Sequence, residues 1–466
     1  MAGRSSPLVS RIDRRRNTAS GWTNWGRTQT CHPKTFAQPR TEAELQALVR
    51  RAAAAEATVK AVGSGHSFTG IACTNSVMVS LDHLSNVHNI KHGGEGSSST
   101  ITVGAGLKLE VLNRVLAEAG LAMTNLGDIA YQTVAGAVST GTHGTGLRFG
   151  GLATQLRALR LVTGTGDVID CDPSTNSDVF AAARVGLGAL GIITRATIAV
   201  EPAFNLHAVE EPLPIDDVLD GWLEHVEAND HFEFFWIPGT RRASTKTNRR
   251  TFDSINPMPR SRYVQDKIFG ENLGFGALCA IGSRRPSLVP RLAKLMASAP
   301  SRVEYTDHSH KVFASPRWVK FAEMEYSVPL ADLPVVVRRI AEEVKRHKID
   351  LLFPVEARSA AADDVPLSTA YGRPSAYIAV HRYRGRPYQQ YFELVENICN
   401  EHEGRPHWGK IHFQTAQTLV DRYPRWQDFH SVRARMDPAG RFANSYLDRV
   451  LGPLPSGPLN STRAPT

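Results

Sequence analysis

The sequence contains few cysteines and no long hydrophobic run, and each shortage excludes a class of protein. The five cysteines, at positions 31, 73, 171, 279 and 399, are odd in number and form no Cys-x-x-Cys pair, so neither a disulfide framework nor a zinc ribbon is expected. No apolar run approaches the roughly 18 residues that span a bilayer, and the N-terminus lacks the apolar core of a signal peptide. We therefore expect a cytoplasmic protein without a transmembrane segment.

The sequence is also poor in the patterns that nucleic acids and metals require. A large part of the net charge of +9 comes from five arginines within the first 16 residues, and no long basic stripe follows them. The densest histidine groups have no thiolate neighbours and no His-Glu-x-x-His spacing. We expect no nucleic-acid partner and no metal site, while the basic tail is compatible with weak membrane association.

Two phosphate-binding motifs match in spacing but fail in context. Gly186–Gly191 (GLGALG) fits Gly-x-Gly-x-x-Gly, yet an expected helix at 177–184 precedes it and an expected strand at 192–200 follows it. This is the reverse of a dinucleotide fingerprint, which needs a strand before the glycines and a helix after them. Gly404–Lys410 has the spacing of a triphosphate-binding loop, but Ile411 stands where a magnesium-binding hydroxyl is needed. Neither a Rossmann domain nor an ATPase or kinase is predicted.

The periodicity of apolar residues predicts an α+β protein of two domains, because 466 residues exceed one ordinary core. In the second half, strands separated by two packing helices suggest a sheet with helices on one side. In the first half we expect helices at 41–52, 107–119 and 177–184 and strands at 59–62, 101–103, 156–162, 168–171 and 192–200. In the second half we expect strands at 231–238, 321–329, 351–359 and 376–384, helices at 331–347 and 388–403, and a basic, turn-rich stretch at 239–262.

Two glycine-rich segments carry candidate binding groups. In Val62–Phe68 (VGSGHSF) two glycines lead into His66. The imidazole is thus expected at the tip of a loop whose backbone can come close to a neighbouring group, because glycine has no side chain. Gly136–Gly146 (GAVSTGTHGTG) interleaves glycines with hydroxyl residues, and its backbone N–H groups suit a diphosphate that no helix dipole serves. Apolar neighbours such as Ala137 and Val138 tie the second segment to a core, which favours cofactor contact over a flexible linker.

A third segment carries charge. Glu356 and Arg358 are two residues apart on an expected strand and therefore share one face, while Phe353, Val355 and Ala357 take the other. A surface ion pair is the alternative for any isolated Glu-x-Arg. Further along, His407-Trp-Gly-Lys410 places another cation beside an aromatic ring.

Taken in order, these segments resemble the aldonolactone oxidase branch of the vanillyl-alcohol-oxidase family, whose members carry an FAD-binding domain of PCMH type. The resemblance rests on VGSGHSF, GAVSTGTHGTG, GLGALGIIT, Glu-x-Arg, RPHWGK and FANSYLDRVLG, and it covers residues 22–452. The chain is most similar to the actinobacterial L-gulono-1,4-lactone dehydrogenases and oxidases of that branch.

The resemblance implies a two-subdomain FAD-binding domain followed by an α+β substrate domain with a large, mostly antiparallel sheet that caps the flavin. The implied division of the chain is a flexible basic tail (1–20), the FAD-binding domain (21–203), the substrate domain (204–435), a C-terminal segment returning towards the flavin (436–453) and a flexible tail (454–466).

The resemblance also implies roles for individual residues. His66 falls where the family links its flavin, so FAD attachment through its imidazole is an open possibility. Gly127 aligns where an alanine blocks oxygen in a related dehydrogenase, and Ile193 is placed near the adenine. Around the diphosphate the resemblance puts Gly63, Ser64, Gly65, Ser67, Ser139, Thr140, Thr142, His143 and Gly144, and in the substrate pocket Glu356, Arg358, Lys410 and His381.

The implied reaction is FAD-dependent oxidation of a secondary alcohol of a sugar lactone, with O2 or a cytochrome- or quinone-type acceptor. Arg358 is excluded as the base because it stays protonated in proteins. Glu356 then orients the substrate and holds Arg358, while Lys410 supplies charge or, with a lowered pKa, takes the proton. Two alternatives stay open: an alditol oxidase that produces hydrogen peroxide, and a flavin-fold binding protein without activity.

Overall fold

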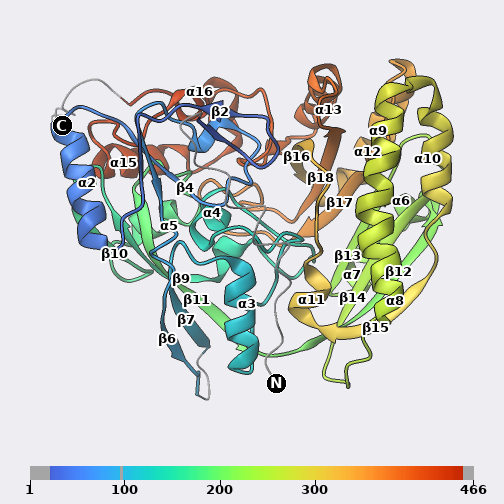
Figure 1. The fold of residues 1–466 in the computed structure, drawn as a ribbon, viewed down its shortest axis with the longest axis horizontal. Helices are drawn as coiled ribbons and strands as arrows, with labels where there is room; N and C mark the ends of the chain where they lie inside the picture. Colours follow the sequence, from blue (N-terminus) through green and yellow to red (C-terminus); the bar gives the residue numbers. More distant parts are fainter. Residues whose placement is uncertain (1–20, 95–97, 455–466) are drawn as a thin grey trace, which may run out of the picture.

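The computed structural model describes residues 21–94 and 98–454 (Figure 1). The predicted N-terminal tail, and the predicted C-terminal tail apart from Leu454, lie outside the described residues. Within the described ranges, no helix combines the length and the apolar character that crossing a membrane demands. All five cysteines are described, and each is a free thiol.

Two hydrophobic cores organise the chain. The first core is built on an antiparallel sheet of order β10-β9-β11-β7-β6, with β8 paired to β11, and on a small parallel sheet of order β3-β5-β4. A two-stranded pair, β1-β2, precedes them. These strands are β1 (Trp22–Thr23), β2 (Thr30–Cys31), β3 (Thr35–Ala37), β4 (Val59–Val62), β5 (Val77–Ser80), β6 (Val87–Lys91), β7 (Ser99–Gly104), β8 (Leu121–Ala122), β9 (Leu156–Val162), β10 (Val168–Cys171) and β11 (Ile192–Pro202).

The second core is built on one eight-stranded sheet of order β15-β12-β14-β13-β17-β18-β16-β19, in which every pairing is antiparallel. The predicted α+β class and large antiparallel sheet are therefore confirmed. The strands are β12 (Asn205–Pro214), β13 (His231–Trp236), β14 (Arg242–Thr251), β15 (Val303–His308), β16 (Phe321–Pro329), β17 (Val355–Ala360), β18 (Ser375–Tyr383) and β19 (Arg405–Pro406).

Helices cover both sheets. Those packed mainly with the first core are α2 (Glu42–Ala54), α3 (Leu109–Glu118), α4 (Val134–Ser139), α5 (Ser177–Ala183), α11 (Ser309–Phe313), α14 (Ala416–Leu419), α15 (Trp426–Met436) and α16 (Ser445–Leu451). Those of the second sheet are α6 (Ile215–Asp220), α7 (Trp222–Ala228), α8 (Arg260–Tyr263), the π-helical η4 (Val264–Gly274), α9 (Phe275–Arg284), α10 (Val289–Ser298), α12 (Leu333–Arg346) and α13 (Gln389–Glu401). Short 3-10 turns are η2 (Gly70–Ala72), η3 (Leu152–Gln155), η5 (Pro286–Leu288), η6 (Leu330–Asp332) and η7 (Val420–Arg422).

The capping chemistry at 41–44 predicts the first helix correctly. The Thr41 side chain accepts a hydrogen bond from the Glu44 backbone N–H at 3.1 Å, and the Glu44 carboxylate accepts one from the Arg40 N–H at 2.8 Å. Leu45 and Val49 then bury one face of α2 in the first core. The hairpin β9–β10 and the strands β4, β13, β16 and β18 also form where their patterns predict them.

The stretch 239–262 departs from the prediction. Residues 242–251 form the ten-residue strand β14 and not turns, because β14 pairs with β12 on one side and with β13 on the other. Ladder hydrogen bonds to two neighbours override the weak strand propensity of a polar, basic sequence.

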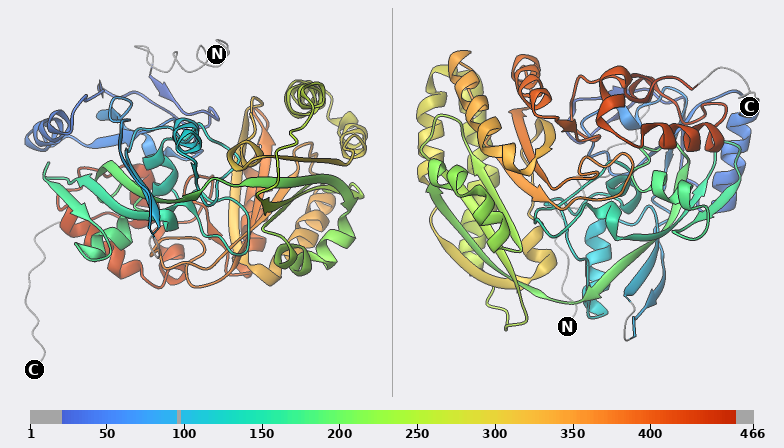
Figure 2. Two further views of the ribbon diagram at one scale, coloured as in Figure 1. Left: turned by 90° about the horizontal axis from the view of Figure 1, so that it is seen from below. Right: turned by 180° about the vertical axis from the view of Figure 1, so that it is seen from behind.

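The prediction of helices on one side of the second sheet is wrong. On one face, Phe232 and Phe234 of β13 pack on Trp222 of α7, with ring centroids 6.0 and 6.1 Å from that of the indole. The alternate residues Glu233 and Phe235 point to the other face, where they face the helices at 260–298 across a cavity. Figure 2 shows helices on both faces of this sheet. The helical segment 260–298 is among the elements that the sequence analysis did not predict.

The C-terminal helices return to the first core, where α15 packs against α5 and α16 packs against η2. The Val59 N–H donates to the Arg441 carbonyl at 2.7 Å. The ammonium of Lys60, which is 2% exposed, donates to the Phe442 carbonyl at 3.0 Å and to the Gly188 carbonyl at 3.4 Å. Three distant segments are thereby joined at the strand that leads into the His66 loop.

This buried lysine predicts a pH dependence of stability. Burial lowers the pKa of Lys60 to about 7, although Asp437 opposes the shift. Between pH 7 and 10 the unfolded chain therefore binds more protons than the native one, and the free energy of unfolding rises by up to about 1.4 kcal/mol per pH unit. We expect Lys60→Met to remove that slope in urea unfolding at pH 7, 8 and 9. The exposed Lys294→Met is the control, and equal slopes in both variants would contradict the expectation.

Candidate active site

A cavity of about 1140 Å³ lies between loops of the first core and strands of the second sheet. Its walls bring together residues that are up to 385 positions apart in the sequence, from Trp25 to Lys410. Ten of the predicted site residues line it: His66, Ser67, Gly127, Thr140, Thr142, His143, Glu356, Arg358, His381 and Lys410.

The other six predicted residues, Gly63, Ser64, Gly65, Ser139, Gly144 and Ile193, do not line this cavity. Gly63 and Gly144 permit close backbone approach, since a Cβ would stand 2.3 Å from Thr133 Oγ1 at the first and 2.2 Å from the Leu126 carbonyl at the second. Ile193 lies in β11 and packs in the first core, 6% exposed. Gly63 and Gly144 thus shape the loops beside the cavity.

The His66 loop is held at both ends. It leaves β4 at Val62, and the Gly65 carbonyl, at a residue with φ +69°, accepts the Trp25 N–H at 2.7 Å. The His66 ring stacks on the Trp25 indole with centroids 5.5 Å apart. The Phe68 N–H donates to the Gly409 carbonyl at 2.7 Å, so the loop is attached to the segment that carries Lys410.

The second glycine-rich segment contains a helix that the sequence reading did not expect. Residues 134–139 form α4, because the Thr133 side chain caps it by accepting the Gly136 N–H at 3.2 Å while Val134, Ala137 and Val138 are buried. Only the residues after Ser139 form a loop. That loop joins the second sheet, where the Gly146 N–H donates to the Ser359 carbonyl at 2.9 Å.

Arg358 stands at the centre of one group of buried charges. As predicted, Glu356 and Arg358 share the cavity face of β17, while Val355 and Ala357 are fully buried on the other face; Phe353, which precedes the strand, lines the cavity as well. The Arg358 guanidinium pairs with Glu356, with Asp128 at 2.7 Å and with Glu233 at 2.8 Å.

Two of the carboxylates around Arg358, those of Asp128 and Glu356, have pKa values that are shifted in opposite directions. Burial would raise the pKa of Asp128, but Arg358 and Arg317 hold it well below its usual range. Burial raises the pKa of Glu356 to about 7, since the neighbouring Asp128 and Glu233 offset much of the attraction of Arg358. Glu356 is thus the carboxyl of this group that can take up a proton near neutral pH.

Lys410 stands in a second group. Its ammonium lies 2.5 Å from Glu323 Oε2 and 4.0 Å from Glu325 Oε2. Burial would lower the pKa of Lys410, but these two carboxylates outweigh it and the pKa is raised. His381 Nε2 lies 3.5 Å from Glu323 and 3.9 Å from Glu356, and so connects the two groups.

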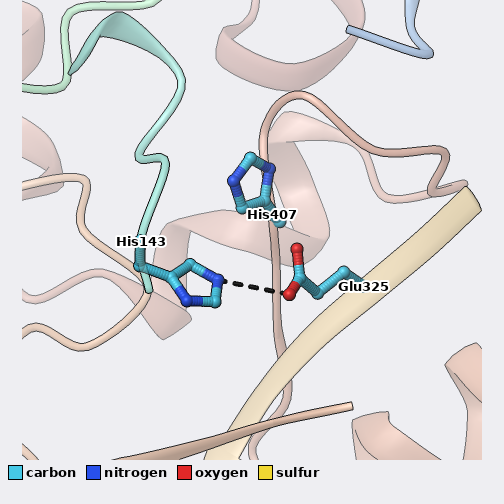
Figure 3. Close-up of side chains that lie close together, drawn as sticks. All are labelled: His143, Glu325 and His407. Carbon is cyan, nitrogen blue, oxygen red and sulfur yellow. Dashed lines mark ion pairs between the residues drawn. The ribbon is translucent and has the colours of Figure 1, made fainter. Parts of the chain in front are cut away.

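His143, Glu325 and His407 form a buried cluster whose potential metal-ligand atoms lie within 4.8 Å of one another (Figure 3). His143 Nδ1 lies 2.9 Å from the Gly144 carbonyl, an acceptor only, and Nε2 lies 3.2 Å from Glu325, so both ring nitrogens face acceptors. His407 Nδ1 accepts the Gly409 N–H at 3.0 Å, and burial lowers its pKa to about 4, so the neutral ring carries its proton on Nε2. The cluster is satisfied by its own hydrogen bonds, and we assign no metal to it.

Sequence reasoning missed four acidic residues of the site: Asp128, Glu233, Glu323 and Glu325. Glu323 and Glu325 alternate with apolar residues in the strand FAEMEYSVP, a signal for two carboxylates on one face that the sequence offered. Glu233 is likewise the one acid in the strand HFEFFW. Asp128 carries no such signal, because it lies in a loop.

The cavity fits FAD. Its volume exceeds the roughly 300–1,000 Å³ of ordinary small-molecule pockets. Along one wall the backbone runs close: a Cβ at Gly127 would stand 2.9 Å from the His143 carbonyl. The residues that would hold the cofactor there are His66, Ser67, Thr140, Thr142 and His143, and the charged groups of β16, β17 and β18 would face its reacting part.

Comparison with known proteins matches both halves of the chain to known families. The model of an "FAD binding domain" matches residues 33–172, and the model of "D-arabinono-1,4-lactone oxidase" matches residues 196–450. An L-gulono-1,4-lactone dehydrogenase of Mycobacterium tuberculosis is 42% identical over 93% of this chain and 99% of its own. An L-gulonolactone oxidase of Mus musculus is 32% identical over 92% and 97%, and a D-arabinono-1,4-lactone oxidase of Eremothecium gossypii is 28% identical over 87% and 86%.

Among solved structures, a cholesterol oxidase from Brevibacterium sterolicum shares the fold, with a TM-score of 0.78 at 17% identity over 92% of this chain and 96% of its own. Fold, cavity and sequence together define an FAD-dependent oxidoreductase. More particularly, the chain belongs to the D-arabinono-1,4-lactone oxidase family.

The Arg358 group predicts a large effect on stability. Arg358→Met leaves three buried carboxylates without their shared cation, so we expect the free energy of unfolding to fall by about 3–5 kcal/mol. Urea unfolding at pH 7 measures this. Arg384→Met, at an exposed position next to β18, is the control. A loss for Arg358→Met no larger than that of the control would show that the group does not stabilise the fold.

Proposed function

We propose that this protein oxidises a secondary alcohol of a sugar lactone, with L-gulono-1,4-lactone as the first substrate to test. The observation that carries the proposal is the convergence of Glu356, Arg358, His381 and Lys410 on the cavity that His66 also lines. The family membership and the names of the relatives support it.

In the proposed reaction the bound flavin supplies a two-electron acceptor for the hydride of the alcohol carbon. Arg358 and Lys410 are cations fixed by carboxylates, and they stabilise negative charge as it develops on the substrate oxygen. Lys410 would need a lowered pKa to act as the base, but its pKa is raised. Glu356, whose pKa lies at about 7, therefore takes the hydroxyl proton.

The test is turnover by the purified protein with an artificial electron acceptor. We expect activity with L-gulono-1,4-lactone, and loss of it in Glu356→Gln with flavin still bound. Xylitol and sorbitol are the comparison substrates. Faster turnover of these sugar alcohols than of any lactone would replace the proposal with an alditol oxidase.

We also propose that His66 carries the flavin covalently. The imidazole lines the cavity and is oriented by the stack on Trp25. We expect the yellow colour to remain in the pellet after acid precipitation and to appear in the supernatant for His66→Ala. Flavin in the wild-type supernatant would make His66 a non-covalent contact.

For the acceptor, we propose that O2 reaches the site past Gly127, which lines the cavity and has no side chain there. Gly127→Ala is expected to lower oxygen consumption while turnover with an artificial acceptor is better retained. Because a Cβ would stand 2.9 Å from the His143 carbonyl, flavin content is measured in parallel. Wild-type protein that consumes no O2 but reduces a cytochrome or quinone would make the enzyme a dehydrogenase.

A further inference from the structure

Glu323 lies where the two groups of buried charges meet. It is 6% exposed and projects from β16 into the cavity. Its two oxygens have different partners: Oε2 lies 2.5 Å from Lys410 Nζ, and Oε1 lies 3.5 Å from His381 Nε2. One carboxylate is thus shared by both nitrogen bases of the proposed substrate pocket.

Lys410 depends on this carboxylate for its charge. The groups that face it are Glu323 and Glu325 of β16, Glu356 of β17 and the Phe68 ring, whose centroid lies 5.3 Å from the ammonium. The Glu323 oxygen lies 1.5 Å closer to the Lys410 ammonium than the Glu325 oxygen does. Without it, burial would favour the neutral amine.

His381 depends on the same carboxylate for its orientation. Its Nδ1 lies 3.1 Å from the Pro354 carbonyl, which only accepts, so Nδ1 carries a proton. Nε2 then faces Glu323 and Glu356. The rings of Phe321 and Phe353, with centroids 5.0 and 5.9 Å away, close the remaining sides.

We propose that Glu323 is a positioning residue for the oxidation: its carboxylate, which Lys410 and His381 share, holds Lys410 as a fixed cation and turns His381 Nε2 toward Glu356. Glu356 is thereby left as the group that accepts the substrate proton. This inference rests on the proposed function and assigns a role to a residue that the sequence motifs do not mark.

The proton and electron balance is simple. The C–H bond of the alcohol breaks with its electron pair, which leaves as hydride to the flavin, and the O–H proton passes to the Glu356 carboxylate as the carbonyl forms. Besides His381, the charged groups near Glu356 are Arg358 on β17, Asp128 in the loop after Gly127, Glu233 on β13, Arg317 and Lys410. Glu323 contacts Lys410 and His381, and it does not contact Glu356.

The experiment is the pH dependence of flavin reduction by L-gulono-1,4-lactone, followed anaerobically by absorbance between pH 5.5 and 10. In the wild type we expect the rate to rise with pH through about 7, as Glu356 loses its proton, and then to stay level. In Glu323→Gln we expect the maximal rate to fall by about tenfold to a hundredfold, with a smaller change in KM. We also expect a new alkaline decline, because burial without the Glu323 charge favours loss of the Lys410 proton.

Two variants separate positioning from mere structure. Glu323→Asp keeps the charge and should remove the alkaline decline. Glu396→Gln neutralises another buried glutamate, which accepts from the Tyr326 hydroxyl at 2.6 Å and the Phe413 N–H at 2.8 Å outside the cavity, and should keep the wild-type profile. Flavin content and thermal unfolding are measured for every variant.

Two results would overturn the inference. One is a Glu323→Gln variant that keeps the wild-type pH profile and rate. The other is an equal fall in the maximal rate of Glu323→Gln and of Glu396→Gln, with no change in the pH profile of either. Failure of the proposed function looks different, since wild-type flavin would then not be reduced by any lactone at any pH. The two failures are therefore distinguishable within one series of measurements.

Discussion

The structure depends on the pairing of opposite charges where the two hydrophobic cores meet. Arg358, Lys410 and the carboxylates around them are at least four-fifths buried, and an unpaired charge in such a place would cost several kcal/mol. Each cation therefore has a carboxylate within hydrogen-bonding distance. The backbone ladders of the sheet bring β13, β16 and β17 to one cavity, and the charge pairs hold their charged side chains inward.

The same interface positions the loops of the first core. Thr145, just before Gly146, donates its hydroxyl proton to the Phe232 carbonyl at 2.6 Å, and the Ser359 N–H donates to the Thr145 hydroxyl oxygen at 3.2 Å. Phe68 is attached to Gly409 in a similar way. Because the loops that would hold the flavin are bonded to the strands that carry the charges, cofactor and substrate groups keep one geometry, which is what hydride transfer requires.

Local chemistry made part of the fold and site predictable. Three local predictions are confirmed: the cap at Thr41, the alternation around Glu356 and Arg358, and the order of helix and strand around Gly186–Gly191. Each of them depends on residues that are close together in the sequence. The predictions failed where distant partners decide. Polar β14 is a strand because two neighbours pair with it, and the helices at 260–298 lie on a sheet face that no local pattern marks.

The sequence by itself determined the class of fold, the family and ten residues that the cavity brings together, because glycine-rich loops and strand alternation depend on adjacent residues. Only the tertiary structure decided which charges meet. The tertiary structure places Glu323 in contact with both Lys410 and His381. It also raises the pKa of Glu356 by burial, while nearby carboxylates keep the pKa of Lys410 raised. Both results depend on distances and burial across four segments of the chain. Coulomb energy depends on separation and local dielectric, and neither is a property of residues close together in the chain.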